Sequence, residues 1–329
     1  MKALCFERFG GPEVLTYRDV PTPELQPGHA RVRMKAIGLN FADIYRRRGN
    51  YHLAGQPPYI AGYEGAGVIE ALDATGGTGG PVEARFAVGD RVAFADAPFA
   101  NAEYVRVPLE KLVPVPQEIS FKQAAALLLQ GLTAHYLVRD SRRVAPGEVA
   151  LVHAAAGGVG PLLSQMVRLQ GGRALGLVSS PEKQRFARET GAEDAFLYSE
   201  DWVARALAAT GGRGVDVAYD SVGKTLLDSF RAVRKGGQVV FYGMAGGDPA
   251  PVDPRMLMDT SKTLTGGDLW NVLTSHRERL DRSAELFGWV RDGRLKLTLA
   301  RTFPLAEGAE AHRLLEGRGT MGKILLIPS

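Results

Sequence analysis

The sequence contains very little cysteine: Cys5 is the only one among 329 residues. A single cysteine excludes an intramolecular disulfide and any zinc site built on clustered cysteines. Histidine is also sparse and dispersed, without the i, i+3 or i+4 spacing of a metal-binding helix. The six histidines are His29, His52, His135, His153, His276 and His312. We therefore expect no metal centre.

Long hydrophobic runs are absent as well, since no apolar stretch approaches the ~18 residues of a membrane span. The opening "MKALCFERFGG" lacks the basic segment, apolar core and cleavage site of a secretory signal. Hydrophobic residues make up 45% and charged residues 23%, which is typical of a globular protein. We expect a cytoplasmic protein without membrane contact.

The formal charge is +4 and the pI is near 9.1, which leaves nucleic acid as one possible partner. However, the basic residues are scattered except at 45–49 and 139–143, and they do not alternate with aromatic residues as a base-stacking surface requires. Nucleic-acid binding is therefore the less favoured interpretation.

Two patterns divide the chain. Up to about residue 118, short alternating runs such as "RVRMKAIGL" and "DRVAFA" predict a mostly β domain. The stretch 73–90, with its glycine-rich part at 74–80, predicts an exposed hairpin tip. Ser120 and Gln123 then form a capping-box pattern that predicts a helix start. From residue 148, short apolar runs alternate with amphipathic ones, which predicts a doubly wound parallel sheet.

The segment "HAAAGGVG", 153–160, lies between a predicted strand and a predicted helix. In a Rossmann turn the three small positions allow a tight bend, close approach to the pyrophosphate and helix–strand packing. Ala155, Gly157 and Gly160 occupy them, and the following helix N-terminus favours phosphate. We interpret the segment as a dinucleotide site rather than a simple packing turn.

The end of the second strand selects the cofactor, because an acid there favours NAD and repels a 2′-phosphate. This strand, "ALGLV", is followed by "SSPEK", with neutral Ser179 and Ser180 and the cation Lys183. NADPH is the better fit, although Ser180 could simply cap a helix that starts at Pro181. Because no Ser/His/Asp nucleophile set is evident, hydride transfer is the simplest remaining chemistry.

Several long motifs carry a family resemblance: "AIGLNFADIYRRRGNY", "AGYEGAGVI", "ISFKQAAALLLQGLTAHYL", "AYDSVG" and "HRLLEGRGTMGKILLIP". Together with the glycine segment they resemble the zinc-independent quinone oxidoreductases, the zeta-crystallin branch of the medium-chain dehydrogenase/reductases. The resemblance implies a GroES-like, mostly β catalytic domain at 1–122, completed by 266–329, and a Rossmann NADPH-binding domain at 123–265. Zinc-dependent relatives have metal ligands at the positions of Asn40 and Tyr63, so the resemblance also implies a metal-free site.

The resemblance further implies residue roles. Catalysis would involve Asn40, Asp43, Tyr45 and Tyr51. The cofactor would be bound by Asn40, Tyr45, Thr133, Gly157, Gly158, Val159, Gly160, Ser180, Lys183, Tyr198, Ser221, Tyr242, Gly243, Met244 and Arg318. Simpler roles stay open. In these, Tyr45 and Tyr51 contribute packing alone, and Asp43 forms a salt bridge to a nearby arginine without taking part in catalysis. Tyr63 is bulkier than the residue in many relatives, which leaves the width of the acceptor pocket open.

The leading functional hypothesis is NADPH-dependent reduction of quinones or other conjugated carbonyl compounds. Within the enzyme class, the alternative is reduction of enones or enoyl thioesters. From another class, the alternative is an NADPH-binding structural or RNA-binding protein. We also expect a homodimer joined through "KTLTGGDLW", 262–270, because an unpaired apolar strand at a sheet edge favours association.

Overall fold

The structure is a computed structural model that describes residues 1–75 and 85–329. Residues 76–84 of the hairpin tip expected at 73–90 lie outside the described residues. The chain forms two compact units: unit 1 comprises Met1–Leu132, Leu273–Gly293 and Leu297–Ser329, and unit 2 comprises Thr133–Val272 and Arg294–Lys296.

Unit 1 is built on two sheets, as the alternating runs predict. Its strands are β1 (Lys2–Phe6), β2 (Thr16–Asp19), β3 (His29–Leu39), β4 (Tyr59–Ile60), β5 (Glu64–Asp73), β6 (Arg91–Ala95), β7 (Tyr104–Pro108), β8 (Leu112–Pro114), β15 (Leu299–Pro304) and β16 (Lys323–Ile327). The larger sheet has the order β15-β16-β3-β5-β6-β8, with β7 also paired to β3, and the smaller has the order β2-β1-β4.

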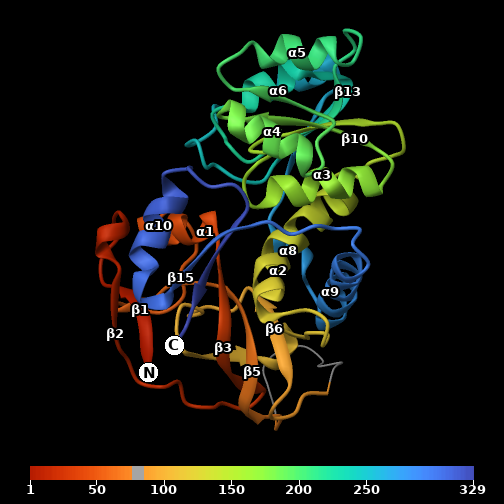
Figure 1. The fold of residues 1–329 in the computed structure, drawn as a ribbon. Coiled ribbons are helices and arrows are strands. Elements are labelled where there is room, and N and C mark those ends of the chain that lie inside the picture. The colour runs from red at the N-terminus through yellow and green to blue at the C-terminus, as the bar shows by residue number, and fades with distance from the viewer. Residues whose placement is uncertain (76–84) are drawn as a thin grey trace. The chain divides into compact units, whose positions relative to one another are not determined.

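The C-terminal segment returns to the N-terminal strands. Strand β16 pairs antiparallel with β3, Leu325 opposite Gly38, and β15 lies parallel to β16. Figure 1 shows this blue segment among the red and orange strands of unit 1. The return of the tail to the first domain is thus confirmed, and it places the beginning of β16 beside the end of β3.

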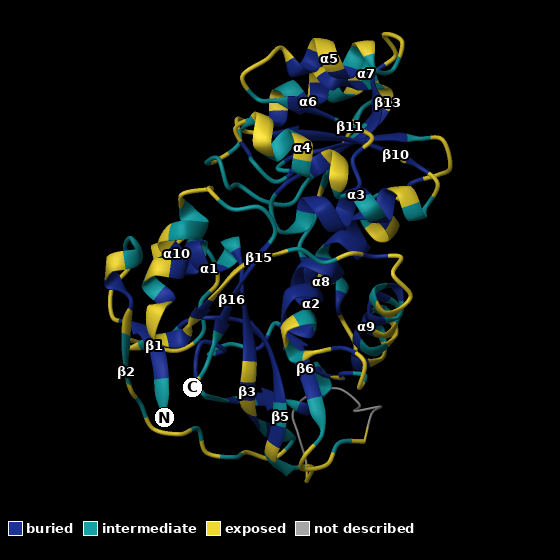
Figure 2. Cartoon of the chain, in the orientation of Figure 1, coloured by how far each residue is buried: buried dark blue, intermediate teal, exposed yellow. Residues whose placement is uncertain are grey.

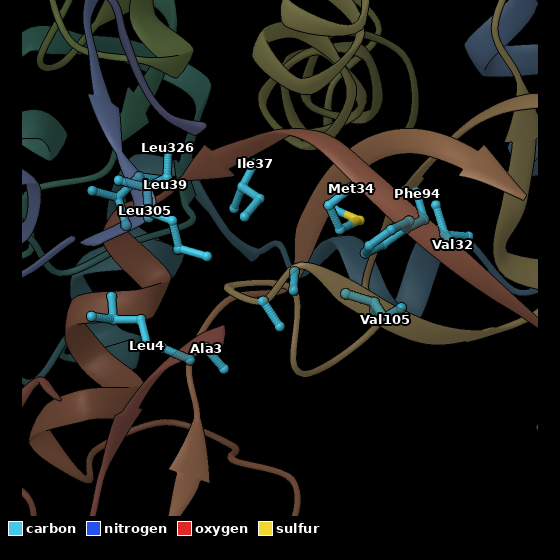
Figure 3. Packing of buried hydrophobic residues seen from close by; sticks show 14 of the residues in the cluster. Ala3, Leu4, Val32, Met34, Ile37, Leu39, Phe94, Val105, Leu305 and Leu326 are labelled. Atoms are coloured by element: carbon cyan, nitrogen blue, oxygen red, sulfur yellow. The ribbon is translucent and has the colours of Figure 1, made fainter. Parts of the chain in front are cut away.

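The core of unit 1 fills the space beneath the larger sheet. Inward-facing residues of β3 alternate along the strand, and Figure 3 shows Val32, Met34, Ile37 and Leu39 pointing to one side of it. Side chains of the N-terminal strand and of the C-terminal segment, such as Leu326, complete the same cluster. Burying these side chains stabilises the unit by about 1.5–3 kcal/mol each.

Four helices belong wholly or partly to unit 1: α1 (Phe41–Arg48), α2 (Phe121–Tyr136), α9 (His276–Arg291) and α10 (Gly308–Glu316). The predicted capping box opens α2: the Ser120 N–H donates to Gln123 Oε1 (2.9 Å), and the Gln123 N–H donates to Ser120 Oγ (3.2 Å). The chain passes from unit 1 to unit 2 within α2.

Unit 2 is a parallel sheet with helical connections, which confirms the doubly wound prediction. Its strands are β9 (Val149–Val152), β10 (Arg173–Val178), β11 (Asp194–Leu197), β12 (Val215–Asp220), β13 (Val233–Phe241) and β14 (Thr263–Gly266). Its helices are α3 (Val159–Leu169), α4 (Pro181–Glu189), α5 (Trp202–Ala208), α6 (Leu226–Ala232), α7 (Pro254–Thr260) and α8 (Leu269–Val272). Figure 2 shows buried strands beside helices, such as α4 and α5, with exposed outer surfaces.

The strand order β11-β10-β9-β12-β13-β14 is that of a Rossmann sheet. The order reverses between β9 and β12, so the loops after these two strands diverge there. Ligands of such sheets bind at this switch point, outside the carboxyl ends of the strands. The segment 153–160 follows β9 and therefore lies at the expected position for a dinucleotide.

The resemblance implies domain boundaries at 122 and 265, and these boundaries remain a proposal. In the structure, the chain passes from one unit to the other at later positions, after Leu132 and after Val272. Contacts within unit 1 account for the difference. The Leu129 N–H of α2 donates to Glu64 Oε1 (2.6 Å), and His276 Nε2 at the start of α9 lies 3.0 Å from the Leu112 carbonyl. These bonds join the middle of α2 and the first turn of α9 to the β domain.

Candidate active site

The candidate catalytic residues of unit 1 lie at the start of α1. Asn40 has extended backbone and precedes the helix, and its N–H donates to Asp43 Oδ2 over 2.9 Å. Both side chains are buried, whereas Tyr45 on the next turn is half-buried. The helix ends at Gly49, whose φ of 81° is left-handed and favours glycine. Four of the implied catalytic positions, Asn40 to Tyr51, are therefore grouped around one short helix.

Asn40 belongs to a buried polar network. Its Nδ2 donates to Glu64 Oε2 (2.8 Å), and its Oδ1 accepts from Gln130 Nε2 (3.1 Å) and from Lys323 Nζ (2.8 Å). Lys323 Nζ also lies 2.7 Å from Glu64 Oε2, with 2% and 0% of the two side chains exposed. These bonds fix the orientation of the Asn40 amide, because its oxygen faces only donors.

Gly38 makes this network sterically possible. A Cβ at this position would lie 2.5 Å from the Ala125 carbonyl oxygen of α2 and would also overlap the carboxylate of Glu64. The absence of a side chain on β3 therefore allows α2 and Glu64 to approach the strand closely.

A second buried ion pair lies on α1. Arg46 Nη1 is 3.3 Å from Asp43 Oδ1, and the two side chains are 3% and 1% exposed. Burial raises the pKa of the Asp43 carboxyl above its ordinary value, while Arg46 opposes this shift. The structure thus provides the arginine partner of the salt bridge that is the simpler interpretation of Asp43.

Aromatic side chains surround the Arg46 guanidinium. Its central carbon is 3.5 Å from the ring centre of Tyr63 and 5.1 Å from that of Tyr51, while the rings of Tyr45 and Tyr51 meet edge to face at 6.2 Å. The Tyr63 hydroxyl accepts from the Ala54 N–H (2.9 Å), and burial raises the pKa of this phenol. Tyr63 therefore packs directly on Arg46.

Unit 2 has its own candidate site, the turn after β9. Ala154 has a left-handed φ of 49°, and its N–H donates to the Tyr198 hydroxyl over 2.9 Å. A Cβ on Gly160 would lie 2.6 Å from the Ala155 Cα, so glycine is required for α3 to pack on the turn. Gly158, at the N-cap of α3, provides no capping side chain. Backbone at the start of a helix with small side chains around it fits a pyrophosphate.

A fully buried cluster lies directly before this turn. His153 Nε2 is 3.0 Å from Ser229 Oγ, which in turn donates to Asp220 Oδ2 over 2.8 Å. The ring also contacts the hydroxyls of Tyr198 and Thr225, each 3.3 Å from Nδ1. Burial lowers the His153 pKa, so the ring is neutral near pH 7. This cluster connects the ends of β9 and β12 and stabilises the turn.

The position of the expected 2′-phosphate contact is the start of α4. Ser180 Oγ accepts from the Lys183 N–H over 3.3 Å, so this serine does cap the helix that begins at Pro181. Ser179 is exposed, and Ser180 and Lys183 are half-buried. Glu182 is the acidic residue in the first turn of the same helix, and it is exposed. This cap leaves the cation and hydroxyls at the carboxyl end of β10, as NADPH requires.

The remaining implied cofactor residues occupy loop and helix positions. The loops after β12 and β13 adjoin, because the Tyr242 N–H donates to the Asp220 carbonyl (3.0 Å) and the Ala245 N–H donates to the Ser221 carbonyl (3.0 Å). Ser221 therefore lies beside the segment Tyr242–Met244, and all four residues are half-buried. Thr133 is half-buried in α2, and Arg318 is exposed after α10 with a φ of 55°.

Sequence reasoning missed Glu64, Gln130, Lys323 and Arg46 as members of the site. A signal was present for two of them: Glu64 and Lys323 are charges inside otherwise small or apolar runs, "GYEGAG" and "GKILLIP". A charge in a buried run needs a partner, and each of these two is the other's partner.

The described part of the chain meets neither the requirements of a metal site nor those of a membrane-spanning helix. Within residues 1–75 and 85–329, no group of three His, Cys, Asp or Glu side chains is arranged to hold a metal ion. Among the same residues, no helix has both the length and the hydropathy for crossing a membrane.

Two sequence families match separate parts of the chain. An alcohol dehydrogenase GroES-like domain matches residues 26–148, and a family described as zinc-binding dehydrogenase matches 190–326. The chain is 42% identical to a quinone oxidoreductase of Pseudomonas aeruginosa, with 99% of each sequence covered. It is 37% identical to a 2-haloacrylate reductase of a Burkholderia species, over 99% of this chain and 98% of that protein.

A solved structure gives the same result. Quinone oxidoreductase of Escherichia coli, crystallised in complex with NADPH, superposes with a TM-score of 0.94 at 34% identity, and both chains are covered completely. Full-length similarity at this level, together with the GroES-like and Rossmann units, shows that this chain belongs to the quinone oxidoreductase family of the medium-chain dehydrogenase/reductases.

Proposed function

We propose that this enzyme reduces quinones with NADPH by hydride transfer, without a metal ion. The observation that carries the proposal is the glycine-lined N-terminus of α3 at the switch point of the Rossmann sheet, in a chain similar over its full length to an NADPH-complexed quinone oxidoreductase. When bound, NADPH supplies the hydride. The protein contributes binding, orientation and electrostatics.

For the cofactor we propose three groups of contacts. The backbone of 157–160 binds the pyrophosphate, with the partial positive charge of the α3 N-terminus facing the phosphates. Ser180, Lys183 and Tyr198 bind the adenosine end. The remaining proposed contacts are Asn40, Tyr45, Thr133, Ser221, Tyr242, Gly243, Met244 and Arg318.

For the acceptor we propose that Asn40, Asp43, Tyr45 and Tyr51 surround the reacting carbonyl. Reduction places negative charge on its oxygen, and preorganised polar groups stabilise such charge most effectively. Burial raises the pKa of the Asp43 carboxyl, and Arg46 holds this carboxyl beside the start of α1. The Asn40 amide is preorganised by the buried network of Glu64, Gln130 and Lys323.

Steady-state oxidation of NADPH with a panel of quinones tests the proposed function. We expect turnover with quinones that persists after dialysis against a zinc chelator. No oxidation of NADPH with any quinone, or activity that is lost on chelation and restored by zinc, would contradict it.

Replacing Lys183 with alanine is expected to weaken NADPH binding by about ten- to a hundredfold, because a charge-assisted contact contributes roughly 1.5–3 kcal/mol. NADH binding should change little, since NADH carries a hydroxyl in place of the 2′-phosphate. Fluorescence titration with both cofactors measures the two affinities. Arg185→Ala, an exposed cation on the same helix, is the matched control. Equal losses for both cofactors would show that Lys183 does not bind the 2′-phosphate.

A second candidate reaction is the reduction of enones or enoyl thioesters. The similarity to a 2-haloacrylate reductase supports an acceptor with an activated carbon–carbon double bond. Enones and an enoyl thioester therefore belong in the same kinetic panel, and the highest kcat/KM identifies the preferred class.

We also propose that the enzyme is a homodimer joined through β14. This strand is the last in the sheet order, three of its four residues are exposed, and Leu264 is 37% exposed. An apolar edge strand favours pairing with a second copy. Leu264→Lys is therefore expected to shift the light-scattering mass from dimer to monomer at micromolar concentration, whereas the control Leu227→Lys, an exposed leucine on α6, should not. A monomeric wild type would contradict the proposal.

We propose the cytoplasm as its compartment. The low cysteine content supports this placement, because small secreted domains commonly depend on disulfides.

A further inference from the structure

Arg46 is an unusual cation for the interior of a protein. Its side chain is only 3% exposed, and its guanidinium lies between the rings of Tyr63 and Tyr51, 3.5 and 5.1 Å from their centres. Aromatic faces attract a cation and hold the planar guanidinium in one orientation. The group is therefore rigid as well as charged.

The hydrogen bonds of Arg46 use only part of its capacity. Nε donates to the His52 carbonyl (3.0 Å), and Nη1 donates to Asp43 Oδ1 (3.3 Å). Nη2 makes no hydrogen bond to any residue in 1–75 or 85–329. A guanidinium has five N–H donors in a fork that matches a carboxylate, so the Nη2 edge remains available to a ligand.

Among the residues that the structure describes, one carboxyl lies within ion-pair distance of Arg46. This is Asp43, whose Oδ1 is 3.3 Å from Nη1. Asp96, whose N–H donates to the Tyr63 carbonyl, pairs with two other cations, Lys111 at 3.3 Å and Arg279 at 3.6 Å. Within the described residues, Asp43 is therefore the ion-pair partner of Arg46, and it contacts Nη1 rather than Nη2.

Two other buried cations of unit 1 also have carboxylate partners. Lys323 pairs with Glu64 at 2.7 Å and also donates to Asn40, and Arg47 pairs with Glu316. The Nη2 edge that is open to an anion therefore belongs to Arg46 and not to the network of Asn40.

We propose that Arg46 binds a carboxylate of the acceptor, so that the enzyme prefers small conjugated carbonyl compounds that carry a carboxylate. This inference rests on the proposed function and specifies its substrate class. A fixed cation also stabilises the negative charge that hydride addition places on the acceptor. The reaction balances as one carbon–carbon double bond reduced and one NADPH oxidised, with one proton taken from water.

A matched pair of enones tests the inference. 4-Oxopent-2-enoate carries a carboxylate, whereas its methyl ester has the same conjugated skeleton without the charge. We expect wild-type kcat/KM to be at least tenfold higher for the acid than for the ester. The saturated acid, 4-oxopentanoate, should bind the cofactor-free enzyme more tightly than its own methyl ester in calorimetric titration, a measurement that does not depend on turnover.

Two variants assign the preference to Arg46. In Arg46→Met, the acid-to-ester ratio of kcat/KM should fall at least tenfold, mainly through KM of the acid, while Arg46→Lys should retain part of it because the charge remains. NADPH affinity and the unfolding temperature of each variant show whether it is folded. If Arg46→Met is unstable, the ratio in Arg46→Lys and the calorimetric preference of the wild type still decide the matter.

The outcomes distinguish a failure of the proposed role of Arg46 from a failure of the proposed function. An unchanged acid-to-ester ratio in both variants, or a wild type that prefers neither form, would overturn the role of Arg46 while quinone reduction stands. Absence of NADPH oxidation with every quinone and enone would instead overturn the proposed function itself.

Discussion

Lys323→Met is expected to lower the free energy of unfolding by about 3–5 kcal/mol, because it leaves the Glu64 carboxylate buried without its cation. Glu64 is fully buried, and Lys323 Nζ lies 2.7 Å from its Oε2. The substitution also removes the Lys323 ammonium that donates, together with Gln130, to Asn40 Oδ1. Chemical denaturation measures the loss, and kcat/KM for a quinone should fall as the Asn40 amide loses its fixed orientation.

The double variant Lys323→Met/Glu64→Gln separates stability from function. An amide at position 64 carries no charge, so the double variant should recover more than half of the lost stability, while kcat/KM should stay low because the ammonium donor to Asn40 is still missing. Lys2→Met is the control: its ion pair with Asp19 is exposed and should contribute almost nothing. A double variant as unstable as Lys323→Met alone would show that the charge of Glu64 is not the cause.

The Rossmann unit was predictable because each signal in it is local. The strand that precedes 153–160, the small residues of the turn and the helix that follows are consecutive in the chain, and alternation with amphipathic helices then implies a parallel sheet. The structure adds one detail that the pattern does not contain. The residue of the turn with left-handed backbone is Ala154, and not Ala155, which occupies the first small position of the motif. The Ala154 N–H donates to the hydroxyl of Tyr198, which follows β11.

The buried network of unit 1 was not predictable from local patterns, because it is assembled by topology. Asn40 follows β3, Glu64 begins β5, Gln130 lies on α2, and Lys323 begins β16. Only the pairing of β16 with β3 brings the last of these beside the first. The apolar run after Lys323 predicts a strand, but its partner strand depends on the whole domain.

Arg46 illustrates a second limit. In the sequence it is part of "YRRRG", a run of charge that usually lies on a solvated helix face. In the structure only Arg48 of the three arginines is exposed, because α1 packs against α10 and beneath Tyr63. Whether a charged residue is buried depends on what covers the helix, and the charge run carries no information about that.

The stability of the protein is expected to decrease steeply below pH 6.5 because of His312 on α10. This ring is fully buried, and neither of its nitrogens has a hydrogen-bond partner in the described structure. Burial, with a smaller effect of the Arg47 charge, lowers the His312 pKa to about 3. An unfolded histidine titrates near 6.5. Between these values the unfolded chain binds a proton that the folded ring does not, so the contribution to stability is complete above pH 6.5 and is lost as the pH falls toward 3.

His312→Met removes this dependence and is the direct test. Methionine is similar in size and apolar, so stability at pH 7 should be equal or higher, since two unpaired nitrogens disappear. Between pH 7 and pH 4 the wild type should lose about 3 kcal/mol more than the variant, because each pH unit below 6.5 contributes about 1.4 kcal/mol. Denaturation at several pH values measures the difference, with His29→Gln, a partly exposed histidine, as control. Parallel pH profiles of wild type and His312→Met would show that the folded ring accepts a proton as readily as the unfolded one, which would contradict the prediction.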